Sequence, residues 1–200
     1  MSIDISEQKV NRNEFGLWLG WTLATAVGMV VGYLPAALFI QDVPLWIARV
    51  LVPLLAGILI SAAQWLVLRN YVVNSRAWMI NHTFGWTIGY IIGLLVVSLV
   101  SGFPLGGLIG YLLFGIIVAL FQFPVLRREI PHLWVWVVAN MIAWTLAAYV
   151  SQVVAGSVFI TTKTTLVTST LLTVGVTGLV GGAITAIALI WLVRKPDQLA

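Results

Sequence analysis

The chain has 200 residues, of which 61% are hydrophobic and only 8% are charged. An average soluble domain carries about 25% charged residues, so this composition excludes a water-soluble fold and predicts a chain embedded in lipid. The net charge of +4 comes from basic residues scattered at the ends of apolar segments, which does not indicate nucleic-acid binding, and the absence of Cys excludes disulfides and thiolate metal sites.

Six apolar runs reach the roughly 20 residues that a membrane-spanning helix needs. In chain order they cover residues 15–40, 45–68, 78–100, 104–126, 133–155 and 166–193. The sequence therefore predicts an all-α polytopic membrane protein with residues 15–193 as a single six-helix membrane domain. Residues 1–14 are predicted to be a cytoplasmic N-terminal segment and residues 194–200 a cytoplasmic tail. The first run is too long and lacks a cleavage site for a signal peptide, so we expect it to be retained.

The basic residues indicate an orientation. Eight lie on the side of the two chain ends, namely Lys9, Arg12, Arg69, Arg76, Arg127, Arg128, Arg194 and Lys195. Only Lys163 and Arg49 belong to the opposite side. Because Lys and Arg are concentrated in cytoplasmic segments, this asymmetry predicts that both termini are cytoplasmic.

Two motifs recur along the chain. Gln64-Trp-Leu-Val-Leu-Arg is repeated as Gln122-Phe-Pro-Val-Leu-Arg, and a more divergent third copy begins at Ile190. The odd runs share Gly-Trp-Thr or Ala-Trp-Thr around Trp21, Trp86 and Trp144, and Trp86 and Trp144 are 58 residues apart, as are Gln64 and Gln122. These matches predict three parallel helical-hairpin repeats, about 15–68, 78–126 and 133–193.

The same motifs predict an interhelical polar layer, because the glutamine of each even run lies at about the depth of the Trp-Thr pair in the preceding run. Its candidate residues are Gln64, Gln122, Trp21, Trp86, Trp144, Thr22, Thr87 and Thr145. Gly85, Gly89 and Gly93 are four residues apart and so share one helix face. They are candidate helix-contact glycines, either within the bundle or on an oligomer face.

The sequence offers no catalytic constellation. No Asp or Glu lies in the apolar middle of a run, so neither acid–base catalysis nor a proton-coupled transporter is indicated. We expect no metal and no cofactor. His82 is the one cofactor candidate, as an axial ligand to a haem or to a chlorophyll-like magnesium, and its alternative role is an interfacial hydrogen bond.

The repeated Gln-Trp-Leu-Val-Leu-Arg ends, together with Gly-Trp-Thr in the preceding run, resemble a set of small uncharacterised multi-pass membrane proteins of cyanobacteria and related bacteria. The resemblance covers roughly residues 16–145 and weakens in the last hairpin, where Ile190 replaces the glutamine. It implies a bacterial inner or thylakoid membrane, and it implies no activity.

These observations favour a non-enzymatic integral membrane protein that serves as a structural or accessory subunit, or as an assembly factor. One alternative is a facilitator or channel for a small neutral or apolar solute. A second alternative is a pigment- or lipid-binding protein. The expected partners are the lipid bilayer and either a membrane protein or a second copy of the chain, without nucleic acid.

Overall fold

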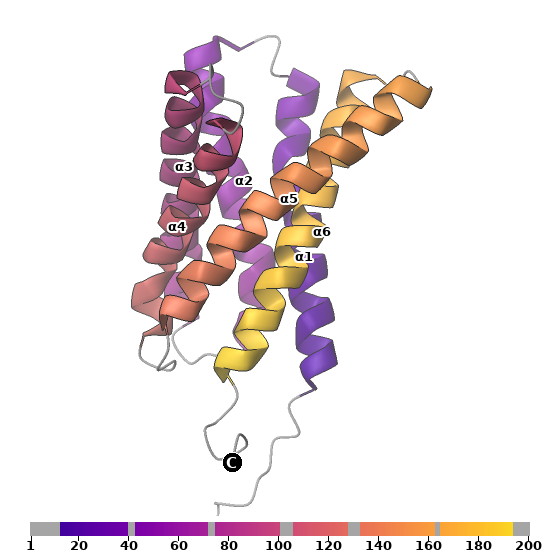
Figure 1. Ribbon diagram of the computed structural model, residues 1–200. Helices are drawn as coiled ribbons and strands as arrows, with labels where there is room; N and C mark the ends of the chain where they lie inside the picture. The colour runs from indigo at the N-terminus through magenta and orange to yellow at the C-terminus, as the bar shows by residue number, and fades with distance from the viewer. Residues whose placement is uncertain are drawn as a thin grey trace, which may run out of the picture.

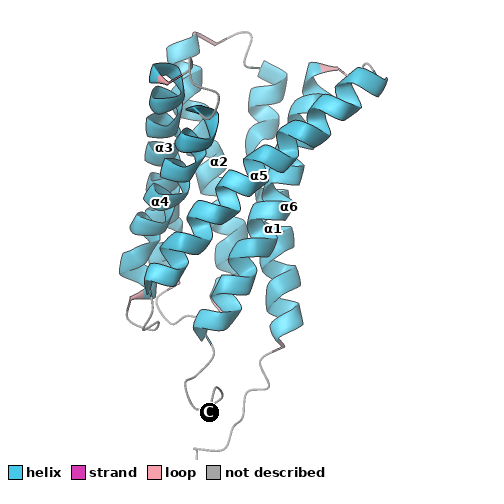
Figure 2. Ribbon diagram, viewed as in Figure 1, coloured by secondary structure: helices cyan, strands magenta, loops and turns pink. Residues whose placement is uncertain are grey.

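The computed structural model describes residues 13–39, 43–71, 75–100, 106–127, 133–162 and 165–193. All regular structure in these ranges is helical, as predicted (Figure 2). The six helices are α1 (Glu14–Phe39), α2 (Leu45–Leu68), α3 (Arg76–Leu99), α4 (Gly106–Leu126), α5 (Leu133–Thr162) and α6 (Leu166–Val193). Each is long and apolar enough to cross a membrane, which indicates an integral membrane protein.

The predicted helix ends agree with the structure to within two residues, with one exception. Helix α5 continues to Thr162, whereas the sequence predicted an end at Ala155. No proline interrupts this stretch, and a helix satisfies its own backbone hydrogen bonds where water is absent. Figure 1 shows α5 running obliquely across the bundle, and such tilting accommodates a helix longer than the hydrocarbon layer.

The helices form a closed ring. Each packs against its neighbours in the chain, and α6 packs against α1. Successive helices run in opposite directions, so α1 begins and α6 ends at the same end of the bundle (the lower end in Figure 1). The terminal segments 1–12 and 194–200 lie outside the described residues.

Gly85, Gly89 and Gly93 all face α4. A methyl group on Gly85 would lie 2.7 Å from Cβ of Phe121, and one on Gly93 would lie 3.0 Å from the carbonyl oxygen of Gly110. Gly89 approaches Phe114 in the same interface. The three glycines therefore bring α3 and α4 close together, and the alternative that they form an oligomer face is wrong because α4 already covers them.

Helix α1 uses glycine contacts on two sides. Gly28 and Gly32 of α1 lie against the backbone of α2, and Gly178 and Gly182 of α6 lie against the backbone of α1. A methyl group at Gly178 would lie 2.6 Å from Cα of Ala26. Such distances require glycine, so these residues fix how closely the ring closes between its first and last helices.

Candidate functional site

Three buried tryptophans meet at the centre of the ring. Trp21 comes from α1, Trp78 from α3 and Trp136 from α5, and at most 1% of each side chain is exposed. Their ring centroids lie 5.5 to 6.3 Å apart with interplanar angles of 64° to 73°. Edge-to-face contacts of this kind are the favourable geometry for aromatic rings. We call these three residues the tryptophan layer.

Each indole N–H of the tryptophan layer donates a hydrogen bond to an even-numbered helix. Trp78 donates to Oε1 of Gln64 at 3.2 Å, and Trp136 donates to Oε1 of Gln122 at 2.7 Å. Trp21 donates to Oγ1 of Thr185 at 3.0 Å. Because water is absent in the hydrocarbon layer, these acceptors remove the cost of burying three donors.

The two glutamines also bond back to odd-numbered helices. Nε2 of Gln64 donates to Oγ1 of Thr25 at 3.0 Å, and Nε2 of Gln122 lies 2.7 Å from Nδ1 of His82. An amide nitrogen only donates, so Nδ1 of His82 accepts and its Nε2 carries the proton of the neutral ring. That Nε2 has no hydrogen-bond partner among the described residues.

His82 is enclosed by aromatic rings. Its ring centroid lies 5.8 Å from that of Trp78 and 5.6 Å from that of Trp86, and the side chain has no exposed surface. A haem or chlorophyll ligand needs open space at its nitrogen, which this packing does not leave. No group of His, Asp or Glu in the described ranges is arranged to hold a metal ion.

The predicted polar layer is only partly assembled. Gln64, Gln122 and Trp21 bond across helices, but Thr22, Thr87 and Thr145 donate to carbonyl oxygens four residues earlier in their own helices, at 2.7 to 2.8 Å. A hydroxyl in a helix can satisfy itself in this way, so these threonines need no partner helix. Trp144 bonds Asn140 of its own helix at 3.1 Å.

The shared Gly-Trp-Thr motif grouped Trp21 with Trp86 and Trp144. In the structure Trp21 instead packs with Trp78 and Trp136, in the tryptophan layer. At the level of Trp86 and Trp144, α1 contributes Met29. The partners Thr25, Trp78, Trp136 and Thr185 were not predicted. One signal in the sequence points to two of them: Gln64 and Trp78 are 14 residues apart, and so are Gln122 and Trp136.

A second aromatic cluster lies two helical turns from the tryptophan layer. Trp86, Phe114 and Trp144 pack edge to face, with centroids 4.9 to 5.6 Å apart and interplanar angles of 83° to 86°. Met29 and Ile60 pack around them. The cluster is buried and borders an open space in the half of the bundle away from the chain ends.

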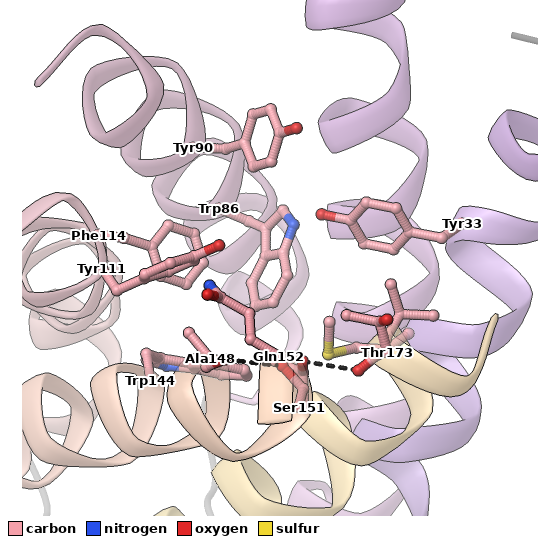
Figure 3. Close-up of a pocket in the computed structure, with 13 residues that line it drawn as sticks. Tyr33, Trp86, Tyr90, Tyr111, Phe114, Trp144, Ala148, Ser151, Gln152 and Thr173 are labelled. Carbon is pink, nitrogen blue, oxygen red and sulfur yellow. Dashed lines mark hydrogen bonds between the residues drawn. The ribbon is translucent and has the colours of Figure 1, made fainter. Parts of the chain in front are cut away.

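This space is a cavity of about 180 Å³ (Figure 3). Residues from α1, α3, α4, α5 and α6 line it, and none of them is charged. They are Met29, Tyr33, Trp86, Tyr90, Tyr111, Phe114, Trp144, Ala148, Ser151, Gln152, Thr173, Val174 and Thr177.

Three hydroxyl groups in the wall already have acceptors. Ser151, Thr173 and Thr177 donate to carbonyl oxygens of their own helices, at 2.7 to 3.0 Å. The N–H of Trp86 is different, because it is buried and has no partner. The hydroxyl of Tyr33 points toward this nitrogen and is close enough to interact with it (Figure 3), although the pair falls short of full hydrogen-bond geometry.

Tyr111 of α4 and Gln152 of α5 line the cavity and are also exposed. Figure 1 shows α4 and α5 diverging toward the upper end of the bundle.

The wall of the cavity is chemically simple. It consists of aromatic and aliphatic side chains, hydroxyl groups, one thioether and one amide, and its lining residues include neither a carboxylate nor a histidine. Neither a protein-family model, nor a curated protein, nor a solved structure matches this chain.

Proposed function

We propose that this non-enzymatic membrane protein binds a small, uncharged and largely apolar molecule within its bundle. The cavity carries the proposal, because six aromatic side chains line about 180 Å³ and no charged group does. An apolar cavity of roughly 150 Å³ is large enough to hold benzene, so a ligand built on a single ring fits this space. A charged ligand would lose its hydration without gaining a partner of opposite charge.

The ligand enters from the lipid, between α4 and α5. Tyr111 and Gln152 stand at this edge, and the bilayer already concentrates apolar molecules. The other end of the cavity is closed by the cluster of Trp86, Phe114 and Trp144, below which the tryptophan layer fills the bundle.

Binding explains this geometry better than passage. An apolar molecule crosses lipid unaided, so a protein path for it adds little. A pocket that is open to lipid and closed toward the far end of the bundle selects a molecule and retains it. We therefore favour a small-molecule-binding membrane protein over a channel.

A large pigment is not part of this proposal. A macrocycle exceeds 180 Å³ several-fold, and His82, the candidate ligand for one, does not line the cavity. Service as an accessory subunit remains a prediction. Gly85, Gly89 and Gly93, which were the candidates for a partner interface, face α4. An interface with a partner would therefore use another surface.

We further infer that the six helices are three copies of one hairpin. Two hydrogen bonds support this inference, since Trp78 to Gln64 and Trp136 to Gln122 join equivalent residues across successive hairpins. The bond from Trp21 to Thr185 is the third bond of this kind, and it joins the first hairpin to the last. In this register Trp21 corresponds to Trp78 and Trp136.

We also propose that both termini are cytoplasmic, in a bacterial inner or thylakoid membrane. Arg69, Arg76 and Arg127 support this orientation, because they are exposed at the end of the bundle where α1 begins. The other basic residues at the chain ends and in the loops, Lys9, Arg12, Arg128, Lys163, Arg194 and Lys195, lie outside the described residues. The membrane type follows from the resemblance to cyanobacterial proteins.

A variant that fills the cavity tests the proposed binding. Ala148 lines the cavity and is buried, so Ala148→Phe places a ring inside it. Calorimetric titration of the protein in nanodiscs with toluene should show saturable binding, which Ala148→Phe lowers at least tenfold. Empty nanodiscs give the contribution of partition into lipid.

The matched control is Ala77→Phe, because Ala77 is exposed on α3 and does not line the cavity. This variant should bind toluene like the original protein. Equal loss in both variants, or heat that never exceeds partition into empty nanodiscs, contradicts the proposal.

A further inference from the structure

We infer that the ligand carries a carbonyl-type oxygen, which the indole N–H of Trp86 and the hydroxyl of Tyr33 hold together. This inference rests on the proposed binding function and names the chemical class of its ligand. It depends on which polar groups in the cavity wall still lack a partner.

Trp86 supplies the first donor. Its side chain is 2% exposed, it lines the cavity, and its Nε1 has no hydrogen-bond partner. The other cavity tryptophan, Trp144, already donates to Oδ1 of Asn140. The remaining buried indole without an acceptor, that of Trp65, lies beside the Arg69 guanidinium and outside the cavity. A buried N–H without an acceptor is unfavourable, so an acceptor on a bound ligand would be stabilised beside Trp86.

Tyr33 supplies the second donor. Its hydroxyl points toward Nε1 of Trp86 from the opposite helix, α1 (Figure 3). A carbonyl oxygen has two lone pairs and can accept from both groups at once. The hydroxyls of Ser151, Thr173 and Thr177 add no donor, because each already donates to its own helix. A ligand that satisfies the N–H of Trp86 therefore has an acceptor beside that residue and an apolar body among the rings.

A small organic cation is the competing ligand for an aromatic cavity, since cations bind to ring faces. The N–H of Trp86 presents positive charge to the cavity, however, and no lining residue is anionic. Both facts disfavour a cation and favour an acceptor.

Two isosteric probes test the inference. Acetophenone has a carbonyl oxygen, and α-methylstyrene has a methylene group in its place. Calorimetry in nanodiscs, corrected with empty nanodiscs, should show acetophenone binding about tenfold more tightly, as expected for one buried hydrogen bond. The measured quantity is the ratio of the two dissociation constants, which cancels effects common to both probes.

Substitutions locate the hydrogen bond. Trp86→Phe removes the N–H and keeps an aromatic ring, so the ratio should fall to about one. Trp144→Phe is the matched control, because the N–H of Trp144 is already used, and it should keep the ratio even if both probes bind more weakly. Tyr33→Phe removes only a hydroxyl and should reduce the ratio by about threefold, which provides a readout if Trp86→Phe does not fold.

The outcomes separate the two claims. If both probes bind equally to the original protein, the cavity is a binding site but the carbonyl inference is wrong. If phenyltrimethylammonium binds more tightly than either, the inference is also overturned. If no probe binds above partition, the proposed function itself fails.

Discussion

The side-chain amides of Gln64 and Gln122 each use both of their ends inside the bundle. Each oxygen accepts from an indole, and each nitrogen bonds a polar side chain of another helix. Few side chains both donate and accept without carrying a charge, so glutamine suits a site where ionisation is costly. These amides join α2 to α1 and α3, and α4 to α3 and α5.

Gln64→Leu should lower the free energy of unfolding by about 1–3 kcal/mol, because it leaves the Trp78 N–H without its acceptor. Reversible unfolding in mixed detergent measures this change. Gln152→Leu is the control, because Gln152 is exposed, and it should alter stability by less than about 0.5 kcal/mol. Equal effects of the two substitutions would contradict the role of the amide.

The sequence indicated that Gln64 and Gln122 would bond either an indole N–H or a threonine hydroxyl, because a buried amide in lipid must find a partner. It did not identify Trp78 and Trp136 as those partners. Neighbouring tryptophans on one helix lie at different depths, and only the relative shift of the helices decides which of them meets the amide. Thr22, Thr87 and Thr145 were expected in the layer that bonds across helices. Each instead donates its hydroxyl proton to a carbonyl oxygen of its own helix.

Among the helices, the contact between α1 and α6 closes the ring. Gly178 and Gly182 allow the backbone of α6 to approach that of α1, and Trp18 of α1 donates to the carbonyl oxygen of Ala183 at 3.2 Å. The bond from Trp21 to Thr185 joins the same pair of helices. The first and last helices of the chain are thus held by both close packing and hydrogen bonds.

Gly178→Ala should destabilise the protein by about 1–3 kcal/mol, because its methyl group would lie 2.6 Å from Cα of Ala26 and the backbones would have to separate. Gly156→Ala is the matched control in α5, where no atom lies within 4 Å of the added methyl group. That control should be neutral or slightly stabilising, since alanine favours a helix. The same unfolding assay applies, and a neutral Gly178→Ala would show that α1 and α6 are not held at this distance.

Helix positions were accessible from the sequence, because an apolar run of about 20 residues has few alternatives in lipid. The end of α5 was not, because the helix runs beyond the length needed to span and only its tilt accommodates the excess (Figure 1). The sequence left two alternatives for Gly85, Gly89 and Gly93, a contact within the bundle and an oligomer face. The spacing of small residues identifies a contact face but not the helix that covers it.

The two halves of the whole bundle are packed differently along its length. The half near the chain ends is filled by the tryptophan layer and its glutamines, and the other half holds the cavity. The cavity could not be predicted, because it arises where side chains from five helices fail to fill the centre of the ring. Tyr33, Tyr90 and Tyr111 look like ordinary interfacial residues in the sequence.

The proposed orientation predicts which end of the bundle a membrane-impermeant reagent reaches. The natural chain has no Cys, so single substitutions give an unambiguous signal. In intact bacterial spheroplasts, maleimide should label Thr165→Cys, before α6, and should label Asn70→Cys, after α2, only when the membrane is permeabilised. Both positions are exposed, so access to the reagent differs only by side. The reverse pattern would place both termini outside.

The most direct measurement of the central claim is the position of a bound ligand. Crystals grown in lipid and soaked with bromobenzene should show an anomalous bromine peak between Trp86, Trp144 and Tyr33, and the peak should vanish in Ala148→Phe. Bromine found only on the lipid-facing surface, with the cavity empty or filled by side chains, would contradict the account of this protein as a small-molecule-binding membrane protein.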